Sequence, residues 1–309
     1  MMFGAGRRGG PDSKVETRHM VASISTGGAG GRGAVKKPFL SGPVSCIAPA
    51  LVLIALFFIV PVLMLLVRSV LEPAPGLENY AILFGSTTYL RVFSNTFLVA
   101  SLVTIVSVVV GFPVAWALAI LPRRWAVFLL AVIVLSMWTN LLARTYAWMV
   151  LLQRTGIINK VLVNLGIVDS PLALVNNITG VTIGMVYIML PFIILPLMGV
   201  ISSIDASILR AASLCGAGKW QSFTRVLLPL SLPGIAAGAL MIFVMSLGYF
   251  VTPALLGGAS SMMLAELIAQ LVQSLVKWGL GGAAAFVLLV VTLGLYFLQL
   301  RYLKVDKRN

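Results

Sequence analysis

Six long stretches of the chain are rich in apolar residues and carry no charge. They cover residues 38–67, 92–122, 125–143, 170–204, 226–265 and 278–300. A helix needs roughly 17–25 mostly apolar residues to cross a bilayer, and every stretch is long enough. The pattern therefore predicts an all-α polytopic membrane protein with six transmembrane helices, at about 44–67, 92–120, 125–149, 179–200, 232–252 and 280–300.

The segments outside these spans predict the rest of the organisation. Residues 1–43 are rich in Gly, Arg and Ser and lack an apolar period, which is typical of disordered chains. We expect a disordered basic cytoplasmic tail there, a transmembrane domain at 44–303 and a short cytoplasmic tail at 304–309. Two outer loops are each expected to hold a short helix: an amphipathic one at 157–165, and one within "MLAELIAQLVQSLV" at 263–276.

The basic residues are distributed unevenly between the two sides of the predicted membrane domain. The chain has 22 Lys and Arg, 8 Asp and Glu and a net charge of +14. With the N-terminus inside, sixteen of the 22 basic residues fall on the tails and the inner loops, which is the bias of cytoplasmic segments. The charge thus indicates that both termini are cytoplasmic, and we expect the lipid bilayer as a partner and no nucleic acid.

The residues that carry enzyme chemistry are scarce. The chain has one histidine, His19, and two cysteines, Cys46 and Cys215. This inventory cannot supply a histidine-based metal motif, and "GAGKW" lacks the spacing and the final Ser or Thr of an ATP-binding loop. We expect no enzyme activity, no cofactor and no metal. No acid lies at mid-span as a proton or ion relay, so transport energy is expected from another subunit; an ion-coupled carrier or channel acting alone is the less favoured alternative.

The inner segment between the fourth and fifth spans, "RAASLCGAGKWQSFTRVLLPLSLPG", is the most distinctive stretch. Helix formers run from about Ile204 to Phe223, and small residues at helical spacing would let another surface approach closely. Pro229 and Pro233 are expected to end the helical run, because proline lacks the N–H donor and clashes with the preceding turn. From pattern alone the segment could either anchor the chain at the interface or receive a push from a cytoplasmic partner.

This segment resembles the coupling motif of ABC importer permeases. The residues that carry the resemblance are Ala211, Ala212, Gly216, Leu228 and Pro229, while Arg210 stands where the family usually has Glu. Further blocks, "MWTNLLARTYAWMVLLQRTGIIN", "GMVYIMLPFIILPL" and "LGYFVTPALLGG", resemble the spermidine/putrescine-type permease branch.

The resemblance implies the fold of a type I ABC importer permease with a cytoplasmic coupling helix, located in a bacterial inner membrane. Such a subunit forms half of a translocation pore with a second permease subunit, often a non-identical relative. Two cytoplasmic ATPase subunits bind the coupling helices, and a periplasmic solute-binding protein delivers the solute. The implied solute is polyamine-like; an opine, an amino-acid derivative or another small organic solute is the alternative.

Two places are candidates for the solute pathway. The outer end of the third span holds Trp138, Thr139, Asn140, Arg144, Thr145 and Trp148. Its aromatic residues are also typical of an interfacial belt, whereas a charged side chain such as Arg144 needs a polar interior or the interface. The outer end of the fifth span holds Tyr249, Thr252 and Pro253, where Gly248 and Pro253 are expected to interrupt the helix and mark a gate. Similar permeases tend to carry an acid in place of Tyr249.

Overall fold

The computed structural model describes residues 43–305, and the regular elements in this range are all helical. In chain order they are α1 (Pro43–Ile54), η1 (Ala55–Ile59), α2 (Val60–Leu71), α3 (Glu78–Gly85), α4 (Thr87–Ile120), α5 (Arg123–Met137), α6 (Leu141–Leu152), α7 (Ile157–Asn164), α8 (Ile178–Ser203), α9 (Ala206–Leu214), α10 (Lys219–Ser222), η2 (Phe223–Leu227), α11 (Leu228–Leu247), α12 (Val251–Leu256), η3 (Ala259–Ser261), α13 (Leu264–Ala269), η4 (Gln270–Ser274) and α14 (Trp278–Val305). The predicted N-terminal tail, apart from Pro43, and residues 306–309 lie outside the described range.

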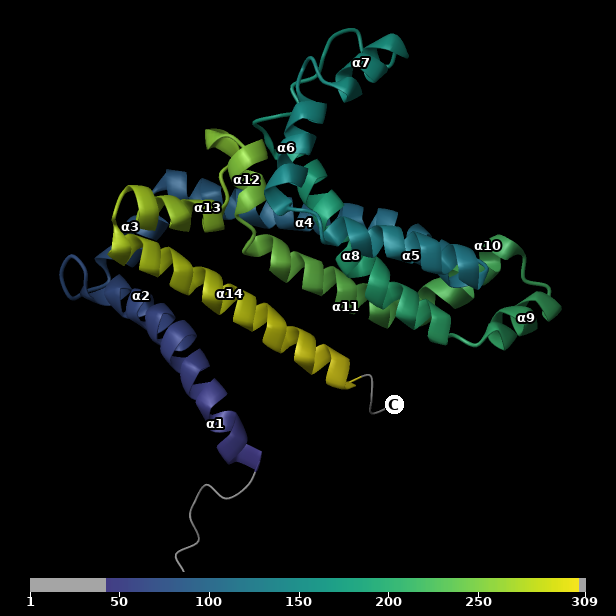
Figure 1. Ribbon diagram of the computed structural model, residues 1–309, viewed down its shortest axis with the longest axis horizontal. Helices are drawn as coiled ribbons and strands as arrows, with labels where there is room; N and C mark the ends of the chain where they lie inside the picture. The colour runs from purple at the N-terminus through teal and green to yellow at the C-terminus, as the bar shows by residue number, and fades with distance from the viewer. Residues whose placement is uncertain (1–42, 306–309) are drawn as a thin grey trace, which may run out of the picture. The chain divides into compact units, whose positions relative to one another are not determined.

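By its internal contacts the chain divides into two units, residues 1–53 and 54–309. The described part of the first unit is α1 as far as Leu53. The second unit contains α2 to α14 and all the residues considered as sites below; Figure 1 labels its helices.

Five stretches of helix are long and apolar enough to cross a membrane, and a bent pair raises the number to six. The five are Ile47–Leu71, Thr87–Ile120, Ile178–Ser203, Lys219–Leu247 and Trp278–Leu298. They correspond to the first, second, fourth, fifth and sixth predicted spans. The prediction of six spans is therefore consistent with the structure.

The third predicted span, 125–149, is not a single straight helix. α5 ends at Met137, and the chain turns by 97° into the segment that begins with α6 at Leu141. Asn140 causes the new start: its side-chain oxygen accepts hydrogen bonds from the backbone N–H of Leu142 at 2.8 Å and of Ala143 at 3.3 Å. Asn is among the most favourable residues at this capping position, so an apolar run that looked continuous is divided.

The fifth span begins earlier than predicted, and Pro229 and Pro233 do not separate it from the helical run that precedes it. The helix is continuous from Lys219 to Leu247 and includes Pro229 and Pro233. A π-helical turn precedes Pro229, in which the N–H of Leu228 bonds to the oxygen of Phe223. The wider turn accommodates the proline ring, which cannot fit a regular turn and lacks an N–H.

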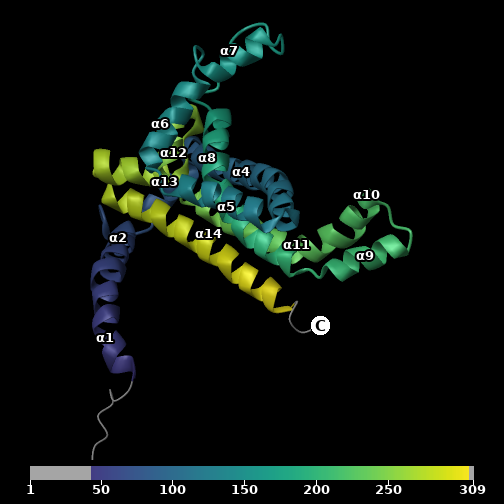
Figure 2. The same ribbon diagram turned by 45° about the vertical axis from the view of Figure 1, so that its right-hand side comes forward.

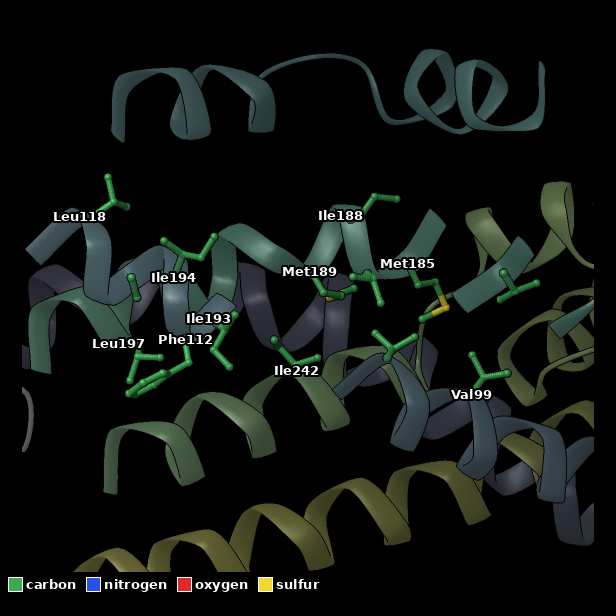
Figure 3. Packing of buried hydrophobic residues seen from close by; sticks show 14 of the residues in the cluster. Val99, Phe112, Leu118, Met185, Ile188, Met189, Ile193, Ile194, Leu197 and Ile242 are labelled. Carbon is green, nitrogen blue, oxygen red and sulfur yellow. The ribbon is translucent and has the colours of Figure 1, made fainter. Parts of the chain in front are cut away.

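The main core of the second unit lies between α4, α8 and α11. Figure 3 shows Val99 and Phe112 of α4, Met189 and Ile193 of α8 and Ile242 of α11 in one buried cluster. Small residues bring the helices close, as is usual in membrane bundles. A Cβ atom at Gly111 would lie 2.6 Å from Cγ2 of Ile193, and one at Gly238 would lie 3.2 Å from its Cγ1. α8 is thereby clamped between its two neighbours.

A second cluster closes the other end of this unit. Buried residues of α3, α4, α13, η4 and α14 meet there, among them Leu83, Val92, Leu264, Leu271 and Leu280. α14 also packs closely against α2, since a Cβ atom at Gly282 would lie 2.4 Å from the backbone oxygen of Leu65. α3 and α13 lie at the end of the unit away from α9 and α10 (Figures 1 and 2).

Candidate coupling segment and solute pathway

The inner segment between α8 and α11 is divided into a short helix, α9, and α10, the first turn of the long helix Lys219–Leu247, rather than being the single helix expected over 204–223. α9 begins at Ala206 after Asp205, whose carboxylate accepts a hydrogen bond of 2.8 Å from the N–H of Ser207. The same bond holds the pKa of the Asp205 carboxyl below its usual range, because it favours the charged form. α9 ends at Leu214, and α10 begins at Lys219.

Glycine, not proline, makes this break. Gly216 has a φ of +87°, in the left-handed region that favours glycine. Its N–H bonds to the oxygen of Ser213 at 3.1 Å, and the N–H of Ala217 bonds to the oxygen of Ala212 at 3.0 Å. These two bonds form the common glycine-dependent helix stop. The glycine of the coupling motif therefore has a definite structural role: it turns the chain from α9 into α10.

Of the six residues predicted for coupling, four lie on α9 or at this turn, and Leu228 and Pro229 begin α11. Arg210, Ala211, Gly216 and Pro229 are exposed, whereas Ala212 and Leu228 are half-buried. Leu228 packs against the main core from the start of α11. The motif thus has an exposed part on α9 and a part that packs against the core at the beginning of the fifth span.

Phe223, which the sequence analysis did not single out, fixes the segment to the membrane bundle. Its ring lies 5.8 Å from that of Phe112 and 5.1 Å from that of Trp116, both on α4, and 5.5 Å from that of Trp220. Between Leu214 and Val226, only Trp220 and Phe223 are large apolar residues, and this was the available signal. Phe223 therefore joins the beginning of the fifth span to α4.

The outer face of the segment is apolar and basic. Leu214 is 90% exposed and Trp220 is 74% exposed. Arg210, Lys219 and Arg225 are exposed around them, and the one acid of the segment, Asp205, caps α9. α9 and α10 project beyond the ends of α8 and α11 (Figures 1 and 2).

Several pathway candidates on the third span have local structural contacts. Trp138 is 85% exposed at the bend. Thr139 donates to the oxygen of Ser136 at 2.7 Å, Asn140 caps α6, and Thr145 donates to the oxygen of Leu141 at 2.9 Å. Their polar groups are engaged in forming the bend, and no contact that they make points to solute.

Arg144 and Trp148 have contacts of another kind. The Nε of Arg144 is buried and has no hydrogen-bond partner within the described chain. The ring of Trp148 lies 5.5 Å from that of Tyr187 of α8. Both aromatic residues line an apolar cavity of about 580 Å³, together with Thr179 and Thr182. A buried guanidinium nitrogen without a partner is costly, which makes Arg144 the strongest of the candidates on this span.

The interruption of the fifth span is confirmed at its outer end. α11 ends at Leu247, and α12 begins at Val251, with Gly248 and Tyr249 between them. Thr252 is fully buried, and its hydroxyl has no hydrogen-bond partner in the described chain. Pro253 is also buried. Tyr249 is half-buried beside the main core. The break leaves polar groups at a place where two helix ends could move.

α12 packs against α6 and α8, so the structure brings the two candidate regions to the same end of the bundle. Gly184 of α8 permits the close approach, because a Cβ atom there would lie 2.4 Å from Cδ1 of Leu256 and 3.0 Å from Cγ2 of Thr252. Arg144, Trp148, Tyr249 and Thr252 consequently belong to neighbouring elements. α9 and α10 are at the far end, beyond the ends of α8 and α11 (Figures 1 and 2).

Comparisons with known proteins agree with this arrangement. Residues 111–308 match the family described as binding-protein-dependent transport system inner membrane component. The spermidine/putrescine transport system permease protein PotB of Escherichia coli K12 is 35% identical over 215 residues, which cover 70% of this chain and 78% of that protein. PotB of Haemophilus influenzae is 36% identical over 233 residues, covering 75% and 81%. These relatives are transport permeases.

A solved structure shares the fold. The crystal structure of a bacterial ABC transporter involved in the import of the acidic polysaccharide alginate matches with a TM-score of 0.66 at 17% identity, over 84% of this chain and 94% of that chain. A second structure, of the bacterial alginate transporter in complex with an alginate pentasaccharide-bound periplasmic protein, matches with a TM-score of 0.68. At this identity the likeness concerns the fold.

Proposed function

Because the chain belongs to the family of binding-protein-dependent transport system inner membrane components, we propose that it forms half of the translocation pore of an ATP-driven importer. It hydrolyses nothing itself. Two cytoplasmic ATPase subunits drive it, a second and non-identical permease subunit completes the pore, and a periplasmic binding protein delivers the solute. Both termini lie in the cytoplasm, in agreement with the basic residues of the tails and inner loops.

The observation that carries the proposal is the anchored inner segment. α9 and α10 present exposed Leu214 and Trp220 outward, while Phe223 packs against α4. A partner that moves this surface also moves the second and fifth spans. We therefore assign ATPase coupling to Arg210, Ala211, Ala212, Gly216, Leu228 and Pro229, with Phe223 as the added anchor.

The proposed solute is a small organic cation of the polyamine class, because the relatives with more than a third of residues identical are permeases for spermidine and putrescine. We assign the pathway to the outer ends of the third and fifth spans, with Arg144, Trp148, Tyr249, Thr252 and Pro253 as its residues. Trp and Tyr faces attract cations.

One observation favours a second solute class. Arg144 is permanently charged, and its Nε has no partner in the described chain. A solute that carries a carboxylate as well as an amine, such as an opine or an amino-acid derivative, would satisfy this guanidinium. A simple polyamine would not.

Reconstitution tests the function and separates the two solute classes. The complete importer, with its ATPase, second permease subunit and binding protein, is placed in proteoliposomes, and uptake of labelled putrescine, spermidine and a zwitterionic amino-acid derivative is measured. The proposal predicts polyamine uptake that requires ATP. Uptake that proceeds equally without the ATPase subunits would support a carrier or channel acting alone and would refute the importer.

A further inference from the structure

The outer helix formed by α13 and η4 has one apolar face and one polar face. Leu264, Leu267 and Leu271 are buried in the second core cluster, on the side facing α3, α4 and α14. At 3.6 residues per turn, Glu266, Gln270 and Gln273 fall on the opposite side of the helix. Gln270 and Gln273 are exposed, and Glu266 is half-buried. The polar side chains extend over about 10 Å, at 1.5 Å per residue.

Glu266 differs from the other acids that the structure describes. Glu78, Asp169 and Asp205 are exposed, and Glu72, which is half-buried, lies 3.6 Å from Arg68. In Glu266, by contrast, Oε2 is buried and has no hydrogen-bond partner within residues 43–305. Burial also raises the pKa of the Glu266 carboxyl, because desolvation disfavours its charged form. A buried carboxylate oxygen left without a partner is costly and calls for a ligand that can donate to it.

The loop before α13 holds Glu266 in place. The amide of Asn95 on α4 donates to the oxygen of Ser260 at 2.8 Å, and the N–H of Leu264 donates to the hydroxyl of Thr96 at 2.8 Å. Asn95 and Thr96 are themselves buried. Two polar residues of the second span thus fix the beginning of α13, so that Glu266 is presented from a rigid support.

The position of α13 relates it to the pathway. α13 packs against α12, the short helix that carries Thr252 and follows the break at Gly248. It lies at the end of the bundle away from α9 and α10 (Figures 1 and 2). A solute that arrives from the outside reaches this end first.

We propose that Glu266 binds an ammonium group of the transported solute, with the side-chain carbonyls of Gln270 and Gln273 accepting its further N–H groups. An ammonium has three donors and no acceptor, and a charge-assisted bond to a carboxylate is about twice as strong as a neutral one. The proposal rests on the proposed function, since it supplies the acid that a cationic solute requires.

Glu266→Gln is a clean variant because it removes the charge and keeps the shape. Glu266 is the third residue of α13, and its carboxylate faces the N–H of Met263, which precedes the helix. Glutamine serves the same capping role, so the fold of the helix is retained. Glu78→Gln is the matched control: Glu78 also lies in the first turn of a short outer helix, α3, but it is exposed.

The assay is polyamine uptake by the reconstituted complete importer, with labelled putrescine and spermidine at limiting concentration. We expect Glu266→Gln to lower uptake at least tenfold, with basal ATP hydrolysis and subunit assembly unchanged, and Glu78→Gln to stay within twofold of the wild type. If polyamine uptake by Glu266→Gln stays within twofold of the wild type, the proposed role of Glu266 is refuted, whereas the proposed importer function still stands.

Two further outcomes are informative. If Glu266→Gln releases the second permease subunit during copurification, the carboxylate pairs with a cationic side chain of that subunit, and the role in solute binding is refuted. If the wild-type importer takes up neither polyamine, the proposed solute class is wrong and the inference falls with it, whatever the variant does.

Discussion

Replacement of Phe223 by alanine tests how motion of the inner segment reaches the membrane bundle. The variant removes the ring pairs with Phe112 at 5.8 Å and with Trp116 at 5.1 Å, which join the segment to α4. Each aromatic pair contributes about 0.5–1.5 kcal/mol, so the attachment loses about 2 kcal/mol. An equilibrium constant changes tenfold for every 1.4 kcal/mol. The loss therefore lowers the ratio of molecules whose inner segment is packed on α4 to molecules in which it is detached roughly 30-fold.

The assay compares solute uptake with ATP hydrolysis in proteoliposomes that contain the complete importer. We expect Phe223→Ala to assemble and to hydrolyse ATP, but to import at least tenfold less solute per ATP than the wild type. Phe128→Ala is the control: Phe128 lies at the beginning of α5 and is exposed, and its ring pair, with Trp125 at 6.4 Å, is within its own helix. A ratio of uptake to hydrolysis within twofold of the wild type in Phe223→Ala would refute the reasoning.

Three more variants test separate parts of the structure. Gly282→Ala should destabilise the purified protein by about 1–3 kcal/mol, because its Cβ would lie 2.4 Å from the oxygen of Leu65. The control Gly294→Ala has open space around its Cβ and should not lower the thermal midpoint of unfolding. Equal midpoints for the two variants would contradict the close packing of α2 and α14. Gly216→Ala forces a residue with a Cβ to a φ of +87°, at a cost of about 1 kcal/mol, and should speed hydrogen exchange at the end of α9, while unchanged exchange would argue against the glycine-dependent turn. Tyr249→Ala should change the rate or selectivity of uptake more than assembly, and unaltered transport kinetics would remove Tyr249 from the pathway.

The number and order of the spans could be predicted because apolar length is a strong and local signal. Charge-free stretches indicated the six spans, and the short outer helices expected near 157–165 and within 263–276 are also present. The errors occurred where one side chain or one turn overrides the average pattern. Asn140 accepts two backbone bonds and divides the third span, and a π-helical turn lets the fifth span continue through Pro229.

The site was only partly predictable for a similar reason. The coupling motif was found by its residues, but the sequence could not show the separate roles of Gly216 and Phe223. The turn at Gly216 depends on backbone geometry. The anchor at Phe223 depends on long-range packing with α4. In the sequence, Glu266 is a single acidic residue in an outer loop, which is only a weak indication of a binding site. Its burial, its unpaired oxygen and its support by Asn95 become evident only when α4 and α13 are placed together.

The central claim is that α9 and α10 receive the force of a separate ATPase, and crosslinking from Cys215 tests it most directly. Cys215 is an exposed thiol at the end of α9, and Cys46→Ser leaves it as the single cysteine of the chain. A photo-crosslinker attached there in membranes that carry the whole importer should join this chain to the ATP-hydrolysing subunit. Crosslinks that reach lipid alone, with the ATPase present in the complex, would contradict the account.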